Sequence, residues 1–173
     1  ENAKAQLGDE LQALSFKNIA GRVSFKPLSN GFDFSTEGLR FDTTDGLHWP
    51  GGNVKVSVKD AENGLGAKGI FLGDKLDLFA VRNIALQLPL PAKARQTLLE
   101  HPVNGLVHTL HVEWLESSNA QDSAFQIKVA NGRFDNFSFD GGKAGTNSEN
   151  FPGIENASIS FDIGPDGGQV KAS

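Results

Sequence analysis

The stretch GLVHTLHVEWLE, residues 105–116, carries apolar side chains at every second position from Leu110 through Val112 to Trp114. Polar residues such as Glu113 stand between them. This period-two alternation predicts a β-strand with one apolar and one polar face. Because strands with one solvent-exposed face are typical of antiparallel sheets, the stretch predicts an antiparallel sheet.

The same alternation recurs along most of the chain. It is seen in Phe32, Phe34; Leu39, Phe41; Val54, Val56, Val58; Phe125, Ile127, Val129; Phe137, Phe139; and Ile159, Phe161, Ile163. Dipeptides that favour tight hairpin turns stand between or beside these runs. They are Asn-Gly at 30–31, 63–64, 104–105 and 131–132, and Asp-Gly at 45–46, 140–141 and 166–167. We therefore expect a mainly β chain of many short strands.

One stretch without glycine, LFAVRNIALQLPLPAKARQTLLEH at 78–101, interrupts this pattern. Its apolar residues have helical spacing, Asp77 is placed to cap the first turn, and two prolines divide the stretch. The spaced residues are Val81, Ile84, Ala85 and Leu88, and the prolines are Pro89 and Pro91. We predict two short helices, at about 78–87 and 91–100. An alternative is a strand, because Ile84, Leu86, Leu88 and Leu90 also alternate.

Composition excludes several classes of protein. The chain has 173 residues, 38% of them hydrophobic, which suffices for the core of a single domain. It contains no cysteine, so disulfides and thiolate chemistry are excluded. Its net charge of -5 and the lack of a basic block argue against a nucleic-acid partner. Its apolar runs are far shorter than the roughly 20 residues that cross a bilayer.

The polar residues give little support for catalysis or metal binding. Strand geometry places His108 on the face of Leu110 and His111 on the opposite face, so we expect no shared metal and no cofactor. Carboxylates on the strands are expected on a solvated sheet face; they are Asp33, Asp42, Glu113 and Asp162. The chain has no nucleophile elbow, phosphate loop or dinucleotide fingerprint, so we predict that it is not an enzyme. An acid–base hydrolase is the least supported alternative.

The aromatic residues are unusual, with thirteen Phe, two Trp and no Tyr. Phe has no polar tip, so each ring favours burial against protein or against an equally apolar ligand. One interpretation is a closed hydrophobic core in which these rings are buried. The other is an apolar face left open as a groove for an acyl chain.

Residues 76–114 resemble a known family. The similar features are Leu88-Pro89-Leu90-Pro91, Leu98-Leu99, Pro102 with Gly105, and Trp114. The segments HWPGGNVKVSV at 48–58 and FPGIENASISFDIGPDGGQVKAS at 151–173 are also similar to the Pro-Gly and Gly-Gly hairpins of that family. On these residues, in this order, the chain resembles the YhdP family of the AsmA-like superfamily over residues 47–173.

The resemblance implies a curved antiparallel sheet, groove-like, with a two-helix insertion at 78–100. It also implies that residues 1–173 are a single β-rich segment of a larger periplasmic protein anchored in the inner membrane. Such proteins are associated with phospholipid transport toward the outer membrane and with its permeability barrier, without catalysis. The implied partners are phospholipid acyl chains and, through the full-length protein, the inner and outer membranes.

Twelve apolar residues are the candidate lipid-binding lining of the groove: Val54, Val56, Val58, Leu110, Val112, Trp114, Phe125, Ile127, Val129, Ile159, Phe161 and Ile163. On this hypothesis the helices form a lid or flank, with Val81, Ile84 and Leu88 packed on the sheet. A closed β-sandwich that serves as a structural or protein-binding module is the alternative. It would bury the same residues in a core.

Overall fold

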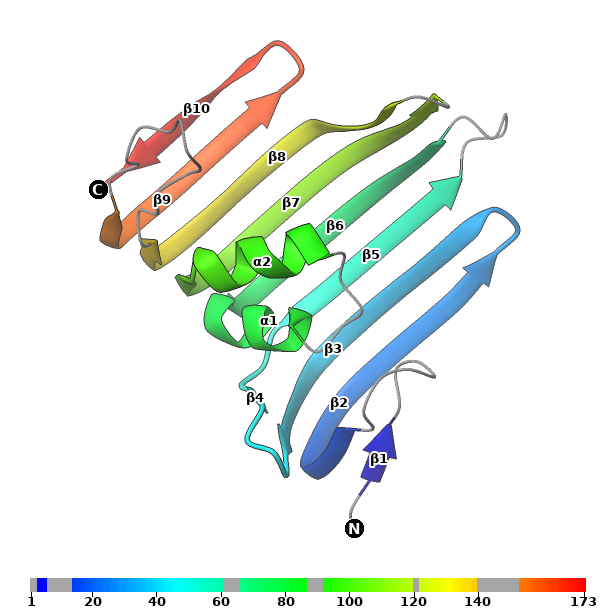
Figure 1. Cartoon of the computed structure of the whole chain (residues 1–173), viewed down its shortest axis with the longest axis vertical. Coiled ribbons are helices and arrows are strands. Elements are labelled where there is room, and N and C mark those ends of the chain that lie inside the picture. The colour runs from blue at the N-terminus through cyan, green and yellow to red at the C-terminus, as the bar shows by residue number, and fades with distance from the viewer. Residues whose placement is uncertain (1–2, 6–13, 61–65, 87–91, 120–121, 140–152) are drawn as a thin grey trace.

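The computed structural model describes residues 3–5, 14–60, 66–86, 92–119, 122–139 and 153–173. They form one open antiparallel sheet with two short helices on one face (Figure 1). The strands follow one another in space as β1-β2-β3-β5-β6-β7-β8-β9-β10, and the short β4 pairs with the end of β3. The predicted mainly β antiparallel fold is confirmed.

The order along the chain is nearly the order in space. The strands are β1 (Ala3–Ala5), β2 (Leu14–Leu28), β3 (Gly31–Thr43), β4 (His48–Trp49), β5 (Asn53–Asp60), β6 (Gly66–Asp77), β7 (Val103–Asn119), β8 (Asp122–Phe139), β9 (Ile154–Gly164) and β10 (Gly167–Ala172). The helices are α1 (Leu78–Ala85) and α2 (Ala92–Glu100). Both helices lie between β6 and β7, so this insertion is the main departure from a simple meander.

Several strands are longer than the sequence predicted, because some expected turns lie inside them. The dipeptides at 30–31, 45–46 and 166–167 do mark turns. Those at 104–105 and 131–132 lie within β7, of 17 residues, and β8, of 18 residues. Gly105 has a φ of 136° and stands at a β-bulge, where an extra residue is accommodated without ending the strand. The dipeptides at 63–64 and 140–141 lie outside the described residues.

The helical insertion is confirmed, and the strand alternative is wrong at Ile84, which lies in α1. Asp77 caps α1 as predicted, because its Oδ1 accepts a hydrogen bond of 3.0 Å from the amide of Ala80. The predicted Pro89 and Pro91 separators lie outside the described residues, as does Leu88. In the described part, no helix is long and apolar enough to cross a bilayer.

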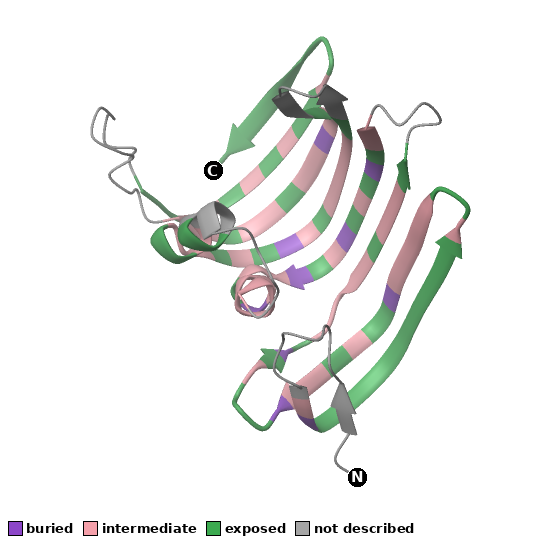
Figure 2. Ribbon diagram, turned by 45° about the vertical axis from the view of Figure 1, so that its right-hand side comes forward, coloured by how far each residue is buried: buried purple, intermediate pink, exposed green. Residues whose placement is uncertain are grey.

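The sheet is curved, and both helices lie on its concave side (Figure 2). The core is small and sits beneath α1, where buried Trp49, Leu76 and Val107 meet buried Ala80 of the helix. Val81 and Ile84 of α1 pack against this cluster, as expected. No second sheet covers the concave face in the described part of the chain, so the closed sandwich is wrong for that part.

Candidate functional site

Strand register brings the apolar residues of the central strands together in rows across the concave face. Val54 of β5, Gly73 of β6 and Leu110 of β7 are successive partners. The next two rows are Val56, Phe71, Val112 and Val58, Gly69, Trp114. Because paired residues project to the same side of a sheet, each row continues the apolar surface of its neighbours. We call this surface the apolar strip.

The rows extend over the outer strands in both directions. On one side, Phe34 of β3 pairs with Val56, and Phe25 of β2 pairs with Phe34. On the other side the rows reach β8 and β9; the partners there are Gly132 with Phe161, Ala130 with Ile163, and Phe134 with Ile159. Eight strands from β2 to β10, excluding β4, at about 4.8 Å spacing give the apolar strip a length of about 34 Å.

The apolar strip is open, because neither helix covers most of it. None of the candidate lining residues whose side chains are described is buried, and Ile127 and Ile163 are 53% and 40% exposed. Phe25 on β2 is 63% exposed and Val170 on β10 is 66% exposed. The buried apolar residues of the described part are Phe16, Trp49, Leu76, Ala80, Val107 and Ala130. A large apolar surface left in water is typical of a ligand or partner site.

Glycines let aromatic rings lie along the apolar strip. A Cβ atom added to Gly69 would lie 1.9 Å from Cζ2 of Trp114, so the indole covers this position. A Cβ atom on Gly132 would lie 2.9 Å from Cζ of Phe161. The rings of Phe161 and Phe134 stack with centroids 5.6 Å apart. Small residues beneath large rings therefore make the strip smoother than strands of β-branched residues alone.

The helices bound the strip at one end of the central strands (Figure 1). α1 packs on β6 and β7 through the core cluster, to which half-buried Leu110 and Phe134 also contribute. Arg82 of α1 donates a hydrogen bond of 2.7 Å from Nε to the carbonyl oxygen of Leu98 in α2, which ties the two helices together. Phe79 of α1 and Leu99 of α2 are 56% and 54% exposed.

Two predicted positions differ in the structure because of β-bulges. Val129 pairs with Glu113, on the opposite face from the strip, whereas Ile127 pairs with Trp114 on it. A register shift between these two pairs inserts one extra residue and breaks the alternation that the sequence suggested. The residue of β8 paired with Val112 is Ala130. The side chain of Phe125 lies outside the described residues, although its backbone pairs with Glu116.

His108 also lies elsewhere than its position in the alternating pattern predicts, which is the apolar face. Val107 and Leu110 both pack in the core cluster, and a register shift lies between Val107 and Thr109. The bulge turns His108 away from the core, and its Nε2 lies 2.6 Å from Oδ2 of Asp135. His111 lies beside Glu113 as predicted, with 3.0 Å between Nε2 and Oε1.

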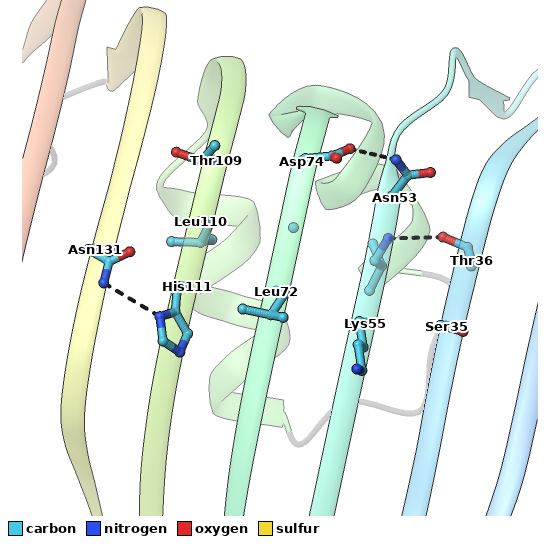
Figure 3. Close-up of a pocket in the computed structure, with 12 residues that line it drawn as sticks. Ser35, Thr36, Asn53, Lys55, Leu72, Asp74, Thr109, Leu110, His111 and Asn131 are labelled. Carbon is cyan, nitrogen blue, oxygen red and sulfur yellow. Dashed lines mark hydrogen bonds between the residues drawn. The ribbon is translucent and has the colours of Figure 1, made fainter.

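The convex face over the same central strands carries polar side chains together with the exposed Ile70 and Leu72. A depression of about 400 Å³ is lined there by side chains that include Lys55, Asp74 and His111 (Figure 3). Asn53 donates a hydrogen bond of 2.8 Å from Nδ2 to Oδ1 of Asp74. No group of three or more histidine, aspartate and glutamate residues is placed to hold a metal ion in the described part. A second cross-strand contact in this depression joins Nδ2 of Asn131 to Nδ1 of His111 at 3.5 Å.

The carboxyl groups with shifted pKa values do not suit acid catalysis. A hydrogen bond from His48 lowers the pKa of Asp42, and one from His108 lowers the pKa of Asp135. A hydrogen bond from the Thr43 hydroxyl lowers the pKa of Asp45. A general acid needs a raised pKa, so these three carboxylates give the hydrolase alternative no support.

Comparison with known proteins gives one match. A family model described as YhdP protein matches residues 1–173. The match extends to the amino-terminal strands, beyond the stretch 47–173 that carries the sequence resemblance. No curated protein and no solved structure matches the chain.

Proposed function

Because the chain belongs to the YhdP family over residues 1–173, we propose that it is a non-catalytic segment that conducts phospholipid along its concave face. Membership of this family indicates a bacterial envelope protein related to lipid transport. The finer role proposed here is transport across the periplasm toward the outer membrane, in support of its permeability barrier. The apolar strip is the proposed lipid-binding surface, and we propose no cofactor and no nucleic-acid partner.

The observation that carries the proposal is the exposure of the apolar strip in rows that cross eight strands. A soluble domain gains by covering such a surface, and acyl chains can cover it without any polar anchor. Each methylene removed from water contributes about 0.8 kcal/mol to binding. Because this gain does not depend on a specific polar contact, one lipid can exchange for another along the strip. That property suits a conduit better than a storage site.

The proposed lining follows the register and keeps the candidates that share the concave face. It comprises Val54, Val56, Val58, Leu110, Val112, Trp114, Ile127, Ile159, Phe161 and Ile163. Val129 is excluded because it lies on the opposite face. Phe25 of β2 and Phe34 of β3, which the sequence did not single out as lining, extend the surface.

The proposed setting is a larger periplasmic protein anchored in the inner membrane, of which residues 1–173 form one β-rich segment. The open sheet supports a role as one segment of a longer conduit. An acyl chain can move from strand to strand along the rows, and on to a neighbouring segment, without entering a closed cavity. The inner and outer membranes are then partners of the full-length protein and not of this segment alone.

Lipid extraction tests the proposal. The chain is purified without detergent from bacterial cells, extracted with organic solvent, and the extract is analysed by mass spectrometry. We expect phospholipid in near-stoichiometric amount, with mixed acyl chains and headgroups. Repeated extracts free of lipid, together with no uptake of added phospholipid, would show that the strip is not a lipid surface.

A further inference from the structure

The convex face carries a second hollow, of about 420 Å³, lined mainly by residues that the lipid-binding proposal does not use. Gly69 and Trp114, which belong to the apolar strip, also contribute to its lining. Its lining includes Lys59, Lys68 and Lys128, with aliphatic Ile70 and Leu115. Ile70 and Leu115 are 41% and 38% exposed, although they lie in a mainly polar face. We call this site the lysine-rimmed hollow.

Strand register places two of the lysines directly opposite each other. Lys59 of β5 pairs with Lys68 of β6, and Lys68 pairs with Leu115 of β7. Neighbouring strands are about 4.8 Å apart, so two like charges stand side by side in this row. Like charges directly opposite in a sheet destabilise it. An anion bound between them would remove this repulsion.

The hollow is positively charged in a chain of net charge -5. It contains three lysines and one carboxylate, Glu113, which lies 3.0 Å from the imidazole of His111. None of the three lysines forms an ion pair with another described residue. The lysines are therefore available to an external anionic group, and charge complementarity selects an acidic partner.

The aliphatic residues narrow the choice of partner. A small inorganic anion would leave Ile70 and Leu115 in water. A bilayer surface is flat on this scale, and these two side chains lie in a hollow, each more than half covered. From the register, charge and exposure together we infer that the hollow binds an acidic segment of a partner protein with aliphatic side chains between its carboxylates.

The test uses the full chain and a short fluorescent peptide of alternating glutamate and leucine, with binding followed by anisotropy. We expect saturable binding that weakens with added salt and falls about tenfold in the Lys59→Glu/Lys68→Glu double variant. The Lys17→Glu/Lys171→Glu variant has the same charge change on the outer strands β2 and β10, outside the lining of the hollow, and it keeps wild-type affinity. Leu115→Ser weakens binding without changing the charge.

Three results would overturn the inference. The first is no saturable binding, and the second is an equal loss in both double variants, which would show general charge attraction. The third is capture by phosphatidylglycerol vesicles or inorganic phosphate that depends on Lys59 and Lys68 but not on Leu115. Phospholipid uptake is measured on the same variants. Since the hollow lies on the face opposite the apolar strip, uptake stays unchanged whichever result the peptide gives.

Discussion

Replacing Ile127 with glutamate tests the proposed lipid-binding surface at one of its most exposed positions. The Ile127 side chain is 53% exposed, so a bound acyl chain can cover about half of it. Full burial of such a side chain contributes about 1.5–3 kcal/mol, and half of that is roughly 0.75–1.5 kcal/mol. Desolvating an unpaired polar group costs about 2 kcal/mol more. Together these terms predict roughly 100-fold weaker phospholipid binding.

A matched control lies on the same pair of strands. Leu115 pairs with Gln126 next to the Trp114 and Ile127 pair, but it projects to the convex face and is 38% exposed. Leu115→Glu therefore introduces the same negative charge next to the Trp114 and Ile127 pair, but on the convex face, so it leaves the apolar strip unchanged. Both positions are exposed, so each variant should retain stability to within about 1 kcal/mol.

The assay is titration of each variant with a fluorescent phospholipid, together with urea unfolding to verify the fold. We expect loss of phospholipid binding in Ile127→Glu and wild-type binding in Leu115→Glu. A folded Ile127→Glu variant that binds lipid normally, or an equal loss of binding in both variants, would refute the proposed lipid-binding surface.

Three further predictions concern the strip, the helix and the pH response. Gly69→Val should displace the Trp114 indole, shift its fluorescence in a Trp49→Phe background, and lower stability by about 1–3 kcal/mol in urea unfolding; an unmoved emission spectrum would contradict the packing. Asp77→Ala should lower the free energy of unfolding by about 1 kcal/mol through loss of the cap, whereas no change would show that α1 needs no cap. Hydrogen bonds lower the pKa of Asp135 below its ordinary value of 3.8, so its stabilising effect is present above that value and lost as the pH falls through the folded-state pKa. Asp135→Asn should therefore flatten the acid limb of stability against pH, and an unchanged limb would contradict the assignment.

Much of the fold could be predicted from side-chain periodicity. Alternation located β5 and β7, because one face of each is mainly apolar and the other mainly polar, and the lack of turn residues located α1 and α2. It did not locate β6 between them, because Ile70, Phe71 and Leu72 are consecutive apolar residues. The Asp77 cap was predictable because it depends on a single local hydrogen bond. The position of Val54 and Leu110 on the apolar faces of their strands followed from the same periodicity, whereas the curvature of the sheet was implied by the family resemblance.

The predictions that were wrong depend on features that the periodicity of a sequence does not show. β-bulges add one residue, and this change moved Val129 off the apolar strip and turned His108 toward Asp135. Asn-Gly at 131–132 favoured a turn, but Gly132 instead makes room for the ring of Phe161. Such contacts depend on strands distant in sequence. The lysine-rimmed hollow was missed for the same reason, because Lys59 and Lys68 meet only through strand pairing.

The location of bound lipid tests the central claim most directly, and Trp114 can report it. In a Trp49→Phe variant, Trp114 is the remaining tryptophan, and bromine atoms in acyl chains quench the fluorescence of a tryptophan that they contact. The account predicts strong quenching of Trp114 by phospholipid brominated in its acyl chains. Stoichiometrically bound brominated lipid that leaves Trp114 emission unchanged would contradict it.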